Sequence, residues 1–115
     1  MENNVIVDKT KHFALQIIKT YNYLSQNKKE FIMSKQLMRS GTSIGANVRE
    51  AQRAQSIPDF YSKMNIALKE AEESLYWIEL LQESGTIKNE SMESLYSECE
   101  EIVRLLVSIT KQQNK

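Results

Sequence analysis

The chain has 115 residues, of which 41% are hydrophobic and 26% charged, with one proline and three glycines. That length suits a single domain, and the composition excludes both a disordered chain and a protein built from many strands and turns. Fifteen basic side chains balance fifteen acidic ones, so the total charge gives no argument for binding nucleic acid or an anionic membrane.

The sequence predicts neither a membrane segment nor a disulfide. The longest stretch without Asp, Glu, Lys or Arg is the nine residues 40–48, whereas a membrane span needs about 20. We expect no signal peptide at the N-terminus. Cys99 is the only cysteine, which excludes an intrachain disulfide and a multi-cysteine metal site. These features predict a cytoplasmic protein with no membrane partner.

The charges are unevenly distributed along the chain. Residues 1–55 hold nine Lys or Arg against four Asp or Glu, a net charge of +5. Residues 56–115 hold six against eleven, a net charge of −5. The two halves either face each other within one folded domain or attract neighbouring copies and partners.

The first predicted helix, residues 8–25, is amphipathic. Its apolar residues recur at spacings of three and four, as one face of a helix requires, and they are Phe13, Ile17, Tyr21 and Leu24. A polar run at 25–30 ends this pattern, and Ser34 is the expected N-cap of the second helix, residues 35–54. The core stripe of the second helix comprises Leu37, Gly41, Ile44, Val48 and Ala51.

Two glycines lie four residues apart in the second predicted helix. Gly41 and Gly45 each cost about 1 kcal/mol of helix propensity relative to alanine, so a closely packed neighbouring helix is needed to compensate. Small residues on the third predicted helix can receive this segment, namely Ala67, Ala71 and Ser74. We therefore expect the closest helix contact between the second and third helices.

The third predicted helix, residues 58–84, has clear boundaries. Ser56 is the expected N-cap, Asp59 occupies the capping-box position, and Pro58 is tolerated in the first turn. Gly85 is the expected C-terminal stop. A fourth helix, residues 90–112, follows with a core stripe of Leu95, Cys99, Ile102, Leu106 and Ile109.

Four helices with short connections predict an all-α fold, an antiparallel up-down-up-down four-helix bundle in one domain over residues 1–115. A long coiled coil is the alternative, and breaks near Asn27, Pro58 and Gly85 argue against it. Apolar residues also extend beyond the core stripes of the third and fourth helices. They predict self-association through Tyr76, Trp77, Leu80, Tyr96, Val103 and Val107, unless long neighbouring side chains of the same chain cover them.

A search for catalytic chemistry finds little. His12 is the only histidine and is interpreted as a surface residue, and Cys99 occupies a core position where a free cysteine behaves as a small apolar residue. A carboxylate metal site near Glu50, Glu70 and the following glutamates is an alternative to a solvated, salt-bridged face. We expect Glu50 and Glu70 to capture arginines or buried hydroxyls, and Asn47 to form an interhelix hydrogen bond. The sequence thus predicts no enzyme, no cofactor and no metal.

The clearest predicted surface feature is basic. On a helical wheel, four cations fall within about 80° of one another, opposite the core stripe of the second helix. They form a candidate nucleic-acid-binding ridge of Lys35, Arg39, Arg49 and Arg53. Such a ridge either follows a phosphate backbone, with steep salt dependence, or is a solvated face.

Residues 36–51 contain the block Arg-Ser-x-x-Ser-Ile-x-Ala-Asn at 39–47, ending in Glu50-Ala51. With Ser56, Asp59-Phe60, residues 67–73 and Tyr76-Trp77, this block resembles the four-helix proteins of intervening sequences in 23S ribosomal RNA genes, over residues 10–110. A relative in that superfamily is the accessory variability determinant of diversity-generating retroelements, a pentameric bundle that works with a reverse transcriptase and nucleic acid. The resemblance implies a pentamer, no enzymatic activity, and a structural role for the signature residues Arg39, Ser43, Ile44, Asn47 and Glu50.

The leading functional hypothesis is a cytoplasmic, non-enzymatic homo-oligomer that acts as an adaptor or scaffold. Its expected partners are copies of itself, with RNA, DNA or another protein as further candidates. The alternative is a nucleic-acid-binding accessory protein that uses the basic ridge, and a carboxylate metalloenzyme is a third hypothesis.

Overall fold

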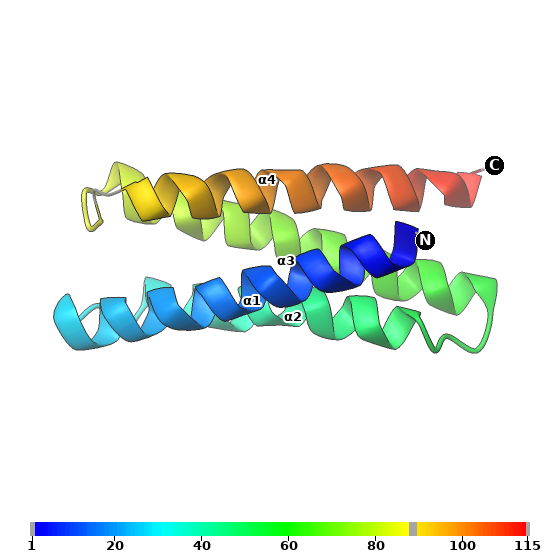
Figure 1. The fold of residues 1–115 in the computed structure, drawn as a ribbon, viewed down its shortest axis with the longest axis horizontal. Coiled ribbons are helices and arrows are strands. Elements are labelled where there is room, and N and C mark those ends of the chain that lie inside the picture. Colours follow the sequence, from blue (N-terminus) through cyan, green and yellow to red (C-terminus); the bar gives the residue numbers. More distant parts are fainter. Residues whose placement is uncertain (1, 88–89, 115) are drawn as a thin grey trace.

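The computed structural model describes residues 2–87 and 90–114 and shows four helices in an antiparallel up-down-up-down bundle (Figure 1). The helices are α1 (Glu2–Asn27), α2 (Met33–Ala51), α3 (Ile57–Glu83) and α4 (Glu90–Lys111), followed by the short 3-10 helix η1 (Gln112–Asn114). The bundle measures 45 × 21 × 19 Å. The predicted all-α four-helix fold is confirmed.

Helix α1 begins six residues earlier than the sequence pattern predicts. Ile6 is buried in the core, and Thr10 is buried one turn later with its hydroxyl donating to the Ile6 carbonyl at 2.8 Å. Thr10 is therefore a polar residue in a core position, and its hydroxyl finds a hydrogen-bond acceptor within its own helix. This polar residue hides the continuation of the apolar stripe from a search based on hydrophobicity alone.

The start of α2 differs from the prediction that Ser34 is its N-cap. Ser34 lies inside the helix, and the N-cap position is Ile32, which has no capping side chain. The carboxylate of Glu30 performs the capping instead, since it accepts hydrogen bonds from the backbone N–H groups of Ile32, Met33 and Ser34 at 2.7–3.0 Å. One longer acidic side chain thus satisfies three amides that would otherwise lack partners.

Helix α3 begins and ends where capping residues predict. Ser56 has extended backbone geometry and its hydroxyl accepts from the Asp59 N–H at 3.1 Å, as expected of an N-cap. The Asp59 carboxylate accepts from the N–H of Gln55 at 3.1 Å. Gly85 follows the helix with φ of 76°, a left-handed conformation that favours glycine.

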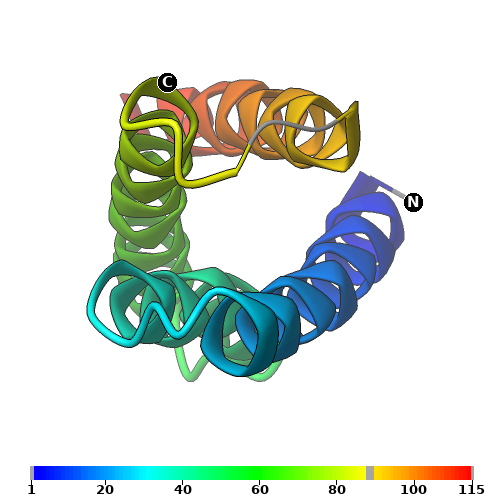
Figure 2. The same cartoon turned by 90° about the vertical axis from the view of Figure 1, so that its left-hand side faces the viewer.

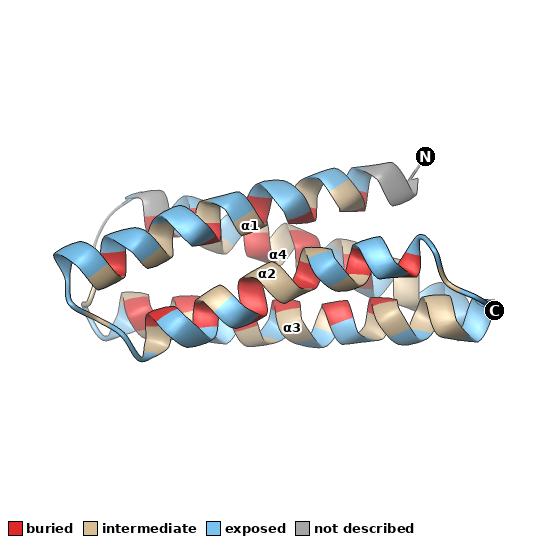
Figure 3. Cartoon of the chain, turned by 90° about the horizontal axis from the view of Figure 1, so that it is seen from below, coloured by how far each residue is buried: buried red, intermediate tan, exposed pale blue. Residues whose placement is uncertain are grey.

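In Figure 3, buried residues recur at intervals along α1, α2 and α3, and the buried side chains of the four helices together form one hydrophobic core. The contact between α2 and α3 is the most extensive. At its centre, the hydroxyls of Ser40 and Ser74 are fully buried and lie 2.8 Å apart, beside the small buried residues Ala67 and Ala71. The predicted close contact between α2 and α3 therefore exists, and it is built by serines and alanines.

The two glycines of α2, in contrast, face α1, so the prediction that they serve the α3 contact is wrong. A Cβ atom on Gly41 would lie 2.8 Å from Cγ1 of the buried Ile17, and one on Gly45 would lie 3.4 Å from the Thr10 carbonyl oxygen. The core stripe alone does not say which of two flanking helices approaches a glycine. Here the absent side chains let α1 approach the backbone of α2.

Viewed from one end, the helices form a square in which α1 lies opposite α3 and α2 lies opposite α4 (Figure 2). Helices that are consecutive in the chain pack closely against each other. The contact between α1 and α4 is the least extensive contact between neighbouring helices of the square. The bundle is thus two helical hairpins, α1–α2 and α3–α4, joined mainly through the contact of α2 with α3.

Candidate interaction surfaces

The two residues most able to do catalytic chemistry are structurally occupied. Cys99 is fully buried and its Sγ donates to the Ala71 carbonyl at 3.3 Å, while burial raises the pKa of the thiol to about 12. A thiol with so high a pKa is a poor nucleophile. His12 is exposed, as predicted, and its Nδ1 lies 2.9 Å from Oε1 of Glu98 on α4.

The polar residues around the signature block form different contacts from those predicted. Glu50 pairs with Lys63 at 3.0 Å rather than with an arginine. The Asn47 amide donates to the Ser43 carbonyl of its own helix at 2.9 Å, so the expected interhelix hydrogen bond is not formed. Ile44 is fully buried, in keeping with a structural role. Within 2–87 and 90–114, no three His, Cys, Asp or Glu side chains gather into a possible metal site.

Arg39 is the centre of a polar network between α2 and α3. Its guanidinium lies 2.6 Å from Oε2 of Glu73 and donates to Oε2 of Glu70 at 3.3 Å. The indole N–H of Trp77 also donates to Glu73, at 3.0 Å. Hydrogen bonds from Trp77 and Arg39 lower the pKa of Glu73, and the bonds from Arg39 to Glu73 and Glu70 raise the pKa of Arg39. The carboxylates of Glu70 and Glu73 therefore compensate the positive charge of Arg39 between α2 and α3.

The predicted basic ridge is therefore shorter than the helical wheel suggests. Arg39 is held by Glu70 and Glu73, and Arg53 lies in the turn after α2, which ends at Ala51. Lys35, Arg49 and Arg53 remain exposed, and Arg49 shares the surface groove between α1 and α2 with Lys11. The free cations thus gather beside the α1–α2 seam as well as along α2.

The ion pairs of the described residues all join the positive half of the sequence to the negative half, as in Lys9 with Glu101 at 3.1 Å. Each half of the sequence also has charged side chains that form no ion pair within the described residues. The exposed cations without an ion pair in the described part are Lys11, Lys19, Lys28, Lys29, Lys35, Arg49 and Arg53 in the positive half, and Lys69, Arg104 and Lys111 in the negative half. The described glutamates of the negative half without an ion pair are the exposed Glu72, Glu83, Glu90 and Glu93 and the half-buried Glu79 and Glu100, so these acids outnumber the unpaired cations of that half. Intramolecular pairing therefore leaves the two hairpins oppositely charged.

The residues predicted to mediate assembly lie mostly along the outer side of the α3–α4 hairpin. The Tyr96 hydroxyl donates to Glu79 of α3 at 3.3 Å, and the pKa of Tyr96 is raised by desolvation and by the nearby Glu100. Helical spacing places Tyr76 beside Glu79, and Val103 and Val107 beyond Glu100. We call this surface the outer face, which comprises Tyr76, Glu79, Tyr96, Glu100, Val103 and Val107, with the exposed Arg104 beside Glu100 and Val107 by the same spacing.

Exposure differs among these predicted assembly residues. Tyr76 is 53% exposed and Val107 36%, whereas Tyr96 and Val103 are half-buried against the core. Trp77 is half-buried, contacts the Tyr76 ring edge-on at 5.3 Å, and is held by Glu73, so it belongs to the packing of its own chain. Leu80 is half-buried. Tyr76 and Val107 thus provide most of the uncovered apolar surface of this set.

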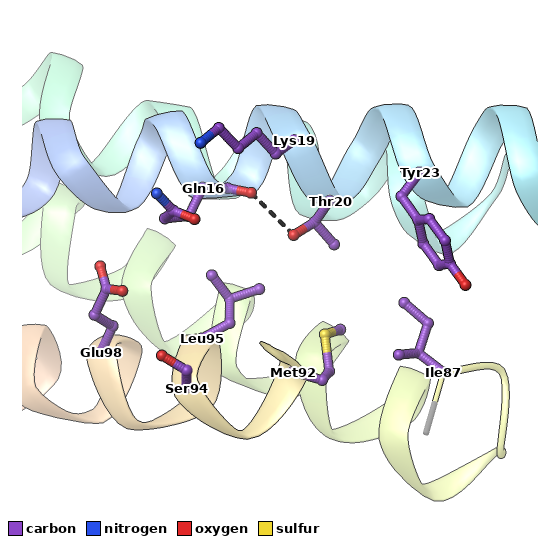
Figure 4. Close-up of a pocket in the computed structure, with 9 residues that line it drawn as sticks. All are labelled: Gln16, Lys19, Thr20, Tyr23, Ile87, Met92, Ser94, Leu95 and Glu98. Atoms are coloured by element: carbon purple, nitrogen blue, oxygen red, sulfur yellow. Dashed lines mark hydrogen bonds between the residues drawn. The ribbon is translucent and has the colours of Figure 1, made fainter. Parts of the chain in front are cut away.

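A groove of about 360 Å³ runs along the loosest seam, between α1 and α4 (Figure 4). The buried residues Ile87, Met92 and Leu95 line its base. Gln16, Lys19, Thr20 and Tyr23 of α1 border it on one side, and Ser94 and Glu98 of α4 on the other. The α1–α4 ion pairs, Lys9 with Glu101 and His12 with Glu98, lie farther along the same seam, and the α1 side chains that border this groove form no ion pair across it within the described residues.

One surface feature was missed by the sequence analysis. The connection between α1 and α2 carries two large apolar side chains in solvent, Phe31 at 54% exposure and Ile32 at 78%. The signal was present, because these residues follow a polar run and precede the apolar stripe of α2 without joining it. Whether these two side chains are exposed depends on the conformation of the connection. Hydrophobic periodicity does not describe that conformation.

Comparison with known proteins agrees with this architecture. Residues 2–108 match the family model described as 23S rRNA-intervening sequence protein. The chain belongs to that family. It is also similar to a crystal structure of a protein of unknown function from the S23 ribosomal protein family of Bacteroides thetaiotaomicron, with 53% sequence identity and a TM-score of 0.93. That similarity covers 96% of this chain and 99% of the other. No functionally curated protein matches the chain.

Family membership confirms the resemblance carried by the signature block and by the helices around it. The solved relative has no known function, so the comparison supplies a fold and a family but no reaction. Among the described residues, no helix is long and apolar enough to cross a membrane.

Proposed function

We propose that this member of the 23S rRNA-intervening sequence family is a non-enzymatic, cytoplasmic homo-oligomer that acts as an adaptor or scaffold. The observation that carries the proposal is the outer face of the α3–α4 hairpin, where the apolar side chains of Tyr76 and Val107 are 53% and 36% exposed. Aromatic side chains on a rigid surface bind partners at low entropic cost.

The absence of converging catalytic groups in the described residues supports a binding role over an enzymatic one. The only cysteine is buried with a raised thiol pKa, and the only histidine is engaged by Glu98 at the surface. The opposite net charges of the two hairpins provide a basis for specific association. A ring of five copies is the assembly that the resemblance to the retroelement accessory proteins suggests.

Sedimentation velocity over a concentration series tests the proposal. The wild-type chain is expected to sediment as a discrete species larger than 13.4 kDa. Replacing both Tyr76 and Val107 with Asp removes the uncovered apolar surface of the face. This change should weaken association by about tenfold or more, as loss of an aromatic hot spot does.

The matched control is Ile57→Asp. Ile57 is 74% exposed at the first turn of α3, is not among the residues of the face, and the substitution introduces the same type of charge. Circular dichroism verifies that all variants keep their helices. A wild-type chain that remains a monomer at high micromolar concentration rejects the proposal, as does a face variant that associates as strongly as the control.

A second candidate function, nucleic-acid binding, is favoured by one observation. Lys11 and Arg49 border the same groove between α1 and α2, close to the exposed Arg53, without ion-pair partners in the described part of the chain. The free cations of this surface, together with Lys35, could follow a phosphate backbone.

A salt titration of duplex DNA and generic RNA binding tests this second function. Replacing Lys35, Arg49 and Arg53 with Ala should make the salt dependence for duplex DNA shallower by up to about 2.7 in log–log slope, about 0.9 for each phosphate that is no longer neutralised. The control Arg39→Ala should leave the slope nearly unchanged, because Arg39 is already neutralised by Glu70 and Glu73. Binding that survives the triple substitution unchanged rejects the ridge.

A further inference from the structure

The groove between α1 and α2 has a volume of about 290 Å³ and lies on the side of α1 that faces away from the α1–α4 groove. Small residues line it, with Ala14 of α1 near Gly45 and Ala46 of α2. A Cβ atom on Gly45 would lie 3.4 Å from the Thr10 carbonyl oxygen, so the two backbones approach closely here. The seam between these helices is therefore concave and bordered by short side chains.

The floor of this groove suits apolar side chains better than phosphates. The Thr42 hydroxyl donates to the Met38 carbonyl at 2.7 Å, and the Thr10 hydroxyl donates to the Ile6 carbonyl at 2.8 Å. Both hydroxyl hydrogens are thus used within their own helices, whereas a bound phosphate needs hydrogen-bond donors. The remaining uncharged residues that line the groove have no polar side-chain atom, and they are Val7, Ala14, Gly45 and Ala46.

Two large apolar side chains of α1 extend this surface. Leu15 is 50% exposed and Ile18 is 36% exposed. Helical spacing places Leu15 one turn beyond Lys11 and Ile18 one turn beyond Ala14, and both Lys11 and Ala14 line the groove. The groove and the two exposed side chains therefore form one apolar strip along α1.

The charges beside this strip are positive. Lys11 and Arg49 line the groove, are exposed, and have no ion-pair partner within the described residues. The acidic residues nearest to them in the sequence lie elsewhere, because Asp8 lines the hollow between α1 and α4 and Glu50 pairs with Lys63 of α3 at 3.0 Å. We call this surface the α1–α2 face, which comprises Lys11, Ala14, Leu15, Ile18, Ala46 and Arg49.

A concave apolar strip with cations at its edge is complementary to an amphipathic helix that has acidic residues beside its apolar side chains. The apolar side chains of such a helix cover Leu15 and Ile18, and its carboxylates meet Lys11 and Arg49. We propose that the α1–α2 face binds an acidic amphipathic helix of another protein, which names the kind of partner for the proposed adaptor and rests on that adaptor role.

Other occupants suit the α1–α2 face less well. A phosphate backbone is attracted by Lys11 and Arg49 but gains nothing from Leu15 and Ile18. A planar bilayer does not follow a concave seam. On the outer face of a second copy, cations lie among the glutamates and would meet Lys11 and Arg49 as like charges, and these cations are Lys69 and Arg104.

Fluorescence anisotropy with a designed peptide tests the proposal. The probe is a hydrocarbon-stapled helix of about 18 residues, about 27 Å long, with leucines along one face and glutamates on both sides of them. The wild-type chain should bind this acidic peptide saturably, with micromolar affinity. A peptide with lysine in place of each glutamate should not bind, because it meets Lys11 and Arg49 as like charges.

Two double variants separate the apolar contribution from the charged one. Leu15→Ser with Ile18→Ser removes the exposed apolar side chains and keeps every charge. Lys11→Gln with Arg49→Gln removes the two cations and keeps the apolar strip. Each double variant should weaken binding of the acidic peptide by about tenfold or more.

Matched controls lie outside the α1–α2 face. Lys69→Gln with Arg104→Gln removes two exposed, unpaired cations of the described residues from the other hairpin. Ile57→Ser removes an apolar side chain that is 74% exposed at the start of α3. Both controls should bind the acidic peptide like the wild type, and circular dichroism verifies that every variant keeps its helices.

The outcomes distinguish this docking from the proposed self-association. A wild type that assembles but does not bind the acidic peptide at about 100 μM rejects the docking and leaves self-association standing. A monomeric wild type that binds the peptide, with losses in both double variants, rejects self-association and keeps the docking. Binding that needs Lys11 and Arg49 but not Leu15 and Ile18 is unspecific attraction between charges and overturns the docking.

Three further measurements test the other occupants with the Leu15→Ser, Ile18→Ser double variant. In sedimentation velocity this variant should assemble like the wild type, and its dissociation would show that a second copy covers the face. Neither duplex DNA nor phosphatidylserine vesicles should bind in a way that depends on Leu15 and Ile18. Binding of either that this variant loses would overturn the docking of a helix and assign the α1–α2 face to nucleic acid or to a lipid surface.

Discussion

The two hairpins of the bundle follow one packing rule but leave different surfaces in solvent. Hairpin α1–α2 packs through glycines, is joined by a hydrogen-bonded connection, and exposes cations around Phe31 and Ile32. Hairpin α3–α4 is joined through Gly85, and exposes Tyr76 and more glutamates than basic residues. Burial of an apolar stripe makes the two hairpins alike in their cores. Their exposed surfaces, which core packing does not constrain, carry opposite net charge.

The largest expected effect contrasts one buried leucine from each hairpin. Leu37 lies in the closed core of α2, whereas Leu95 borders the α1–α4 groove. Leu37→Ala should lower the free energy of unfolding by about 4 kcal/mol, which includes the cost of a closed cavity. Leu95→Ala should cost about 2 kcal/mol, because its space opens to the groove. Urea denaturation at fixed protein concentration measures both, and equal losses would contradict the difference in packing.

A smaller effect tests how closely α1 approaches α2. Gly41→Ala should destabilise the fold by about 1–2 kcal/mol, because the added methyl meets the buried Ile17 and overpacking exceeds the gain in helix propensity. Gly45→Ala, the matched control, meets only ordinary van der Waals contact and should stabilise by up to about 1 kcal/mol. Thermal unfolding compares the two, and effects of the same sign would refute this geometry.

The next effect concerns the Glu30 cap of the connection. Partial burial tends to raise the pKa of Glu30, but hydrogen bonds from the backbone of Met33, Ser34 and Ile32 outweigh it and lower the pKa below 4.5. Glu30→Gln should therefore cost about 1 kcal/mol at neutral pH, as loss of a cap does.

The pH dependence of this cap has a definite sign. A lowered pKa contributes stability that is fully present above the unfolded value of 4.5 and is lost as pH falls through the folded value. The difference between the wild type and Glu30→Gln should consequently shrink below about pH 4.5 in urea titrations. A difference that is constant or grows in acid would show that the carboxylate is not the cap.

The smallest expected effect lies at the seam between the two hairpins, α1 with α4. Lys9→Gln removes an exposed ion pair with Glu101 and should cost only about 0.2–1 kcal/mol, an effect that high salt abolishes. The comparison at the α2–α3 seam is Arg39→Gln, which removes the ion-pair partner of Glu70 and Glu73. The loss of stability that it causes should depend less on salt concentration. Equal salt dependence at the two seams would contradict this contrast.

The sequence predicts the fold well because apolar periodicity and caps act locally. The burial of Ile44 and Cys99, the Ser56 cap and the Gly85 stop all follow from spacing and residue type. The early start of α1 was missed because a self-satisfied Thr10 replaces an apolar residue in the stripe.

Partner choice between helices could not be predicted in the same way. A helical wheel gives the face on which Gly41 or Arg39 lies but not which neighbour meets it, so the glycine contact was assigned to α3 and Arg39 to a free ridge. The exposure of Phe31 and Ile32 depends on the backbone conformation fixed by Glu30, which a periodicity argument does not describe either.

Native mass spectrometry of the wild-type chain tests the central claim most directly, that copies of the chain assemble into a closed ring. The account predicts one dominant closed assembly of more than two copies, with five suggested by the family resemblance, at that multiple of 13.4 kDa. A two-copy species, which pairs like surfaces about a two-fold axis, or a monomer alone would contradict it.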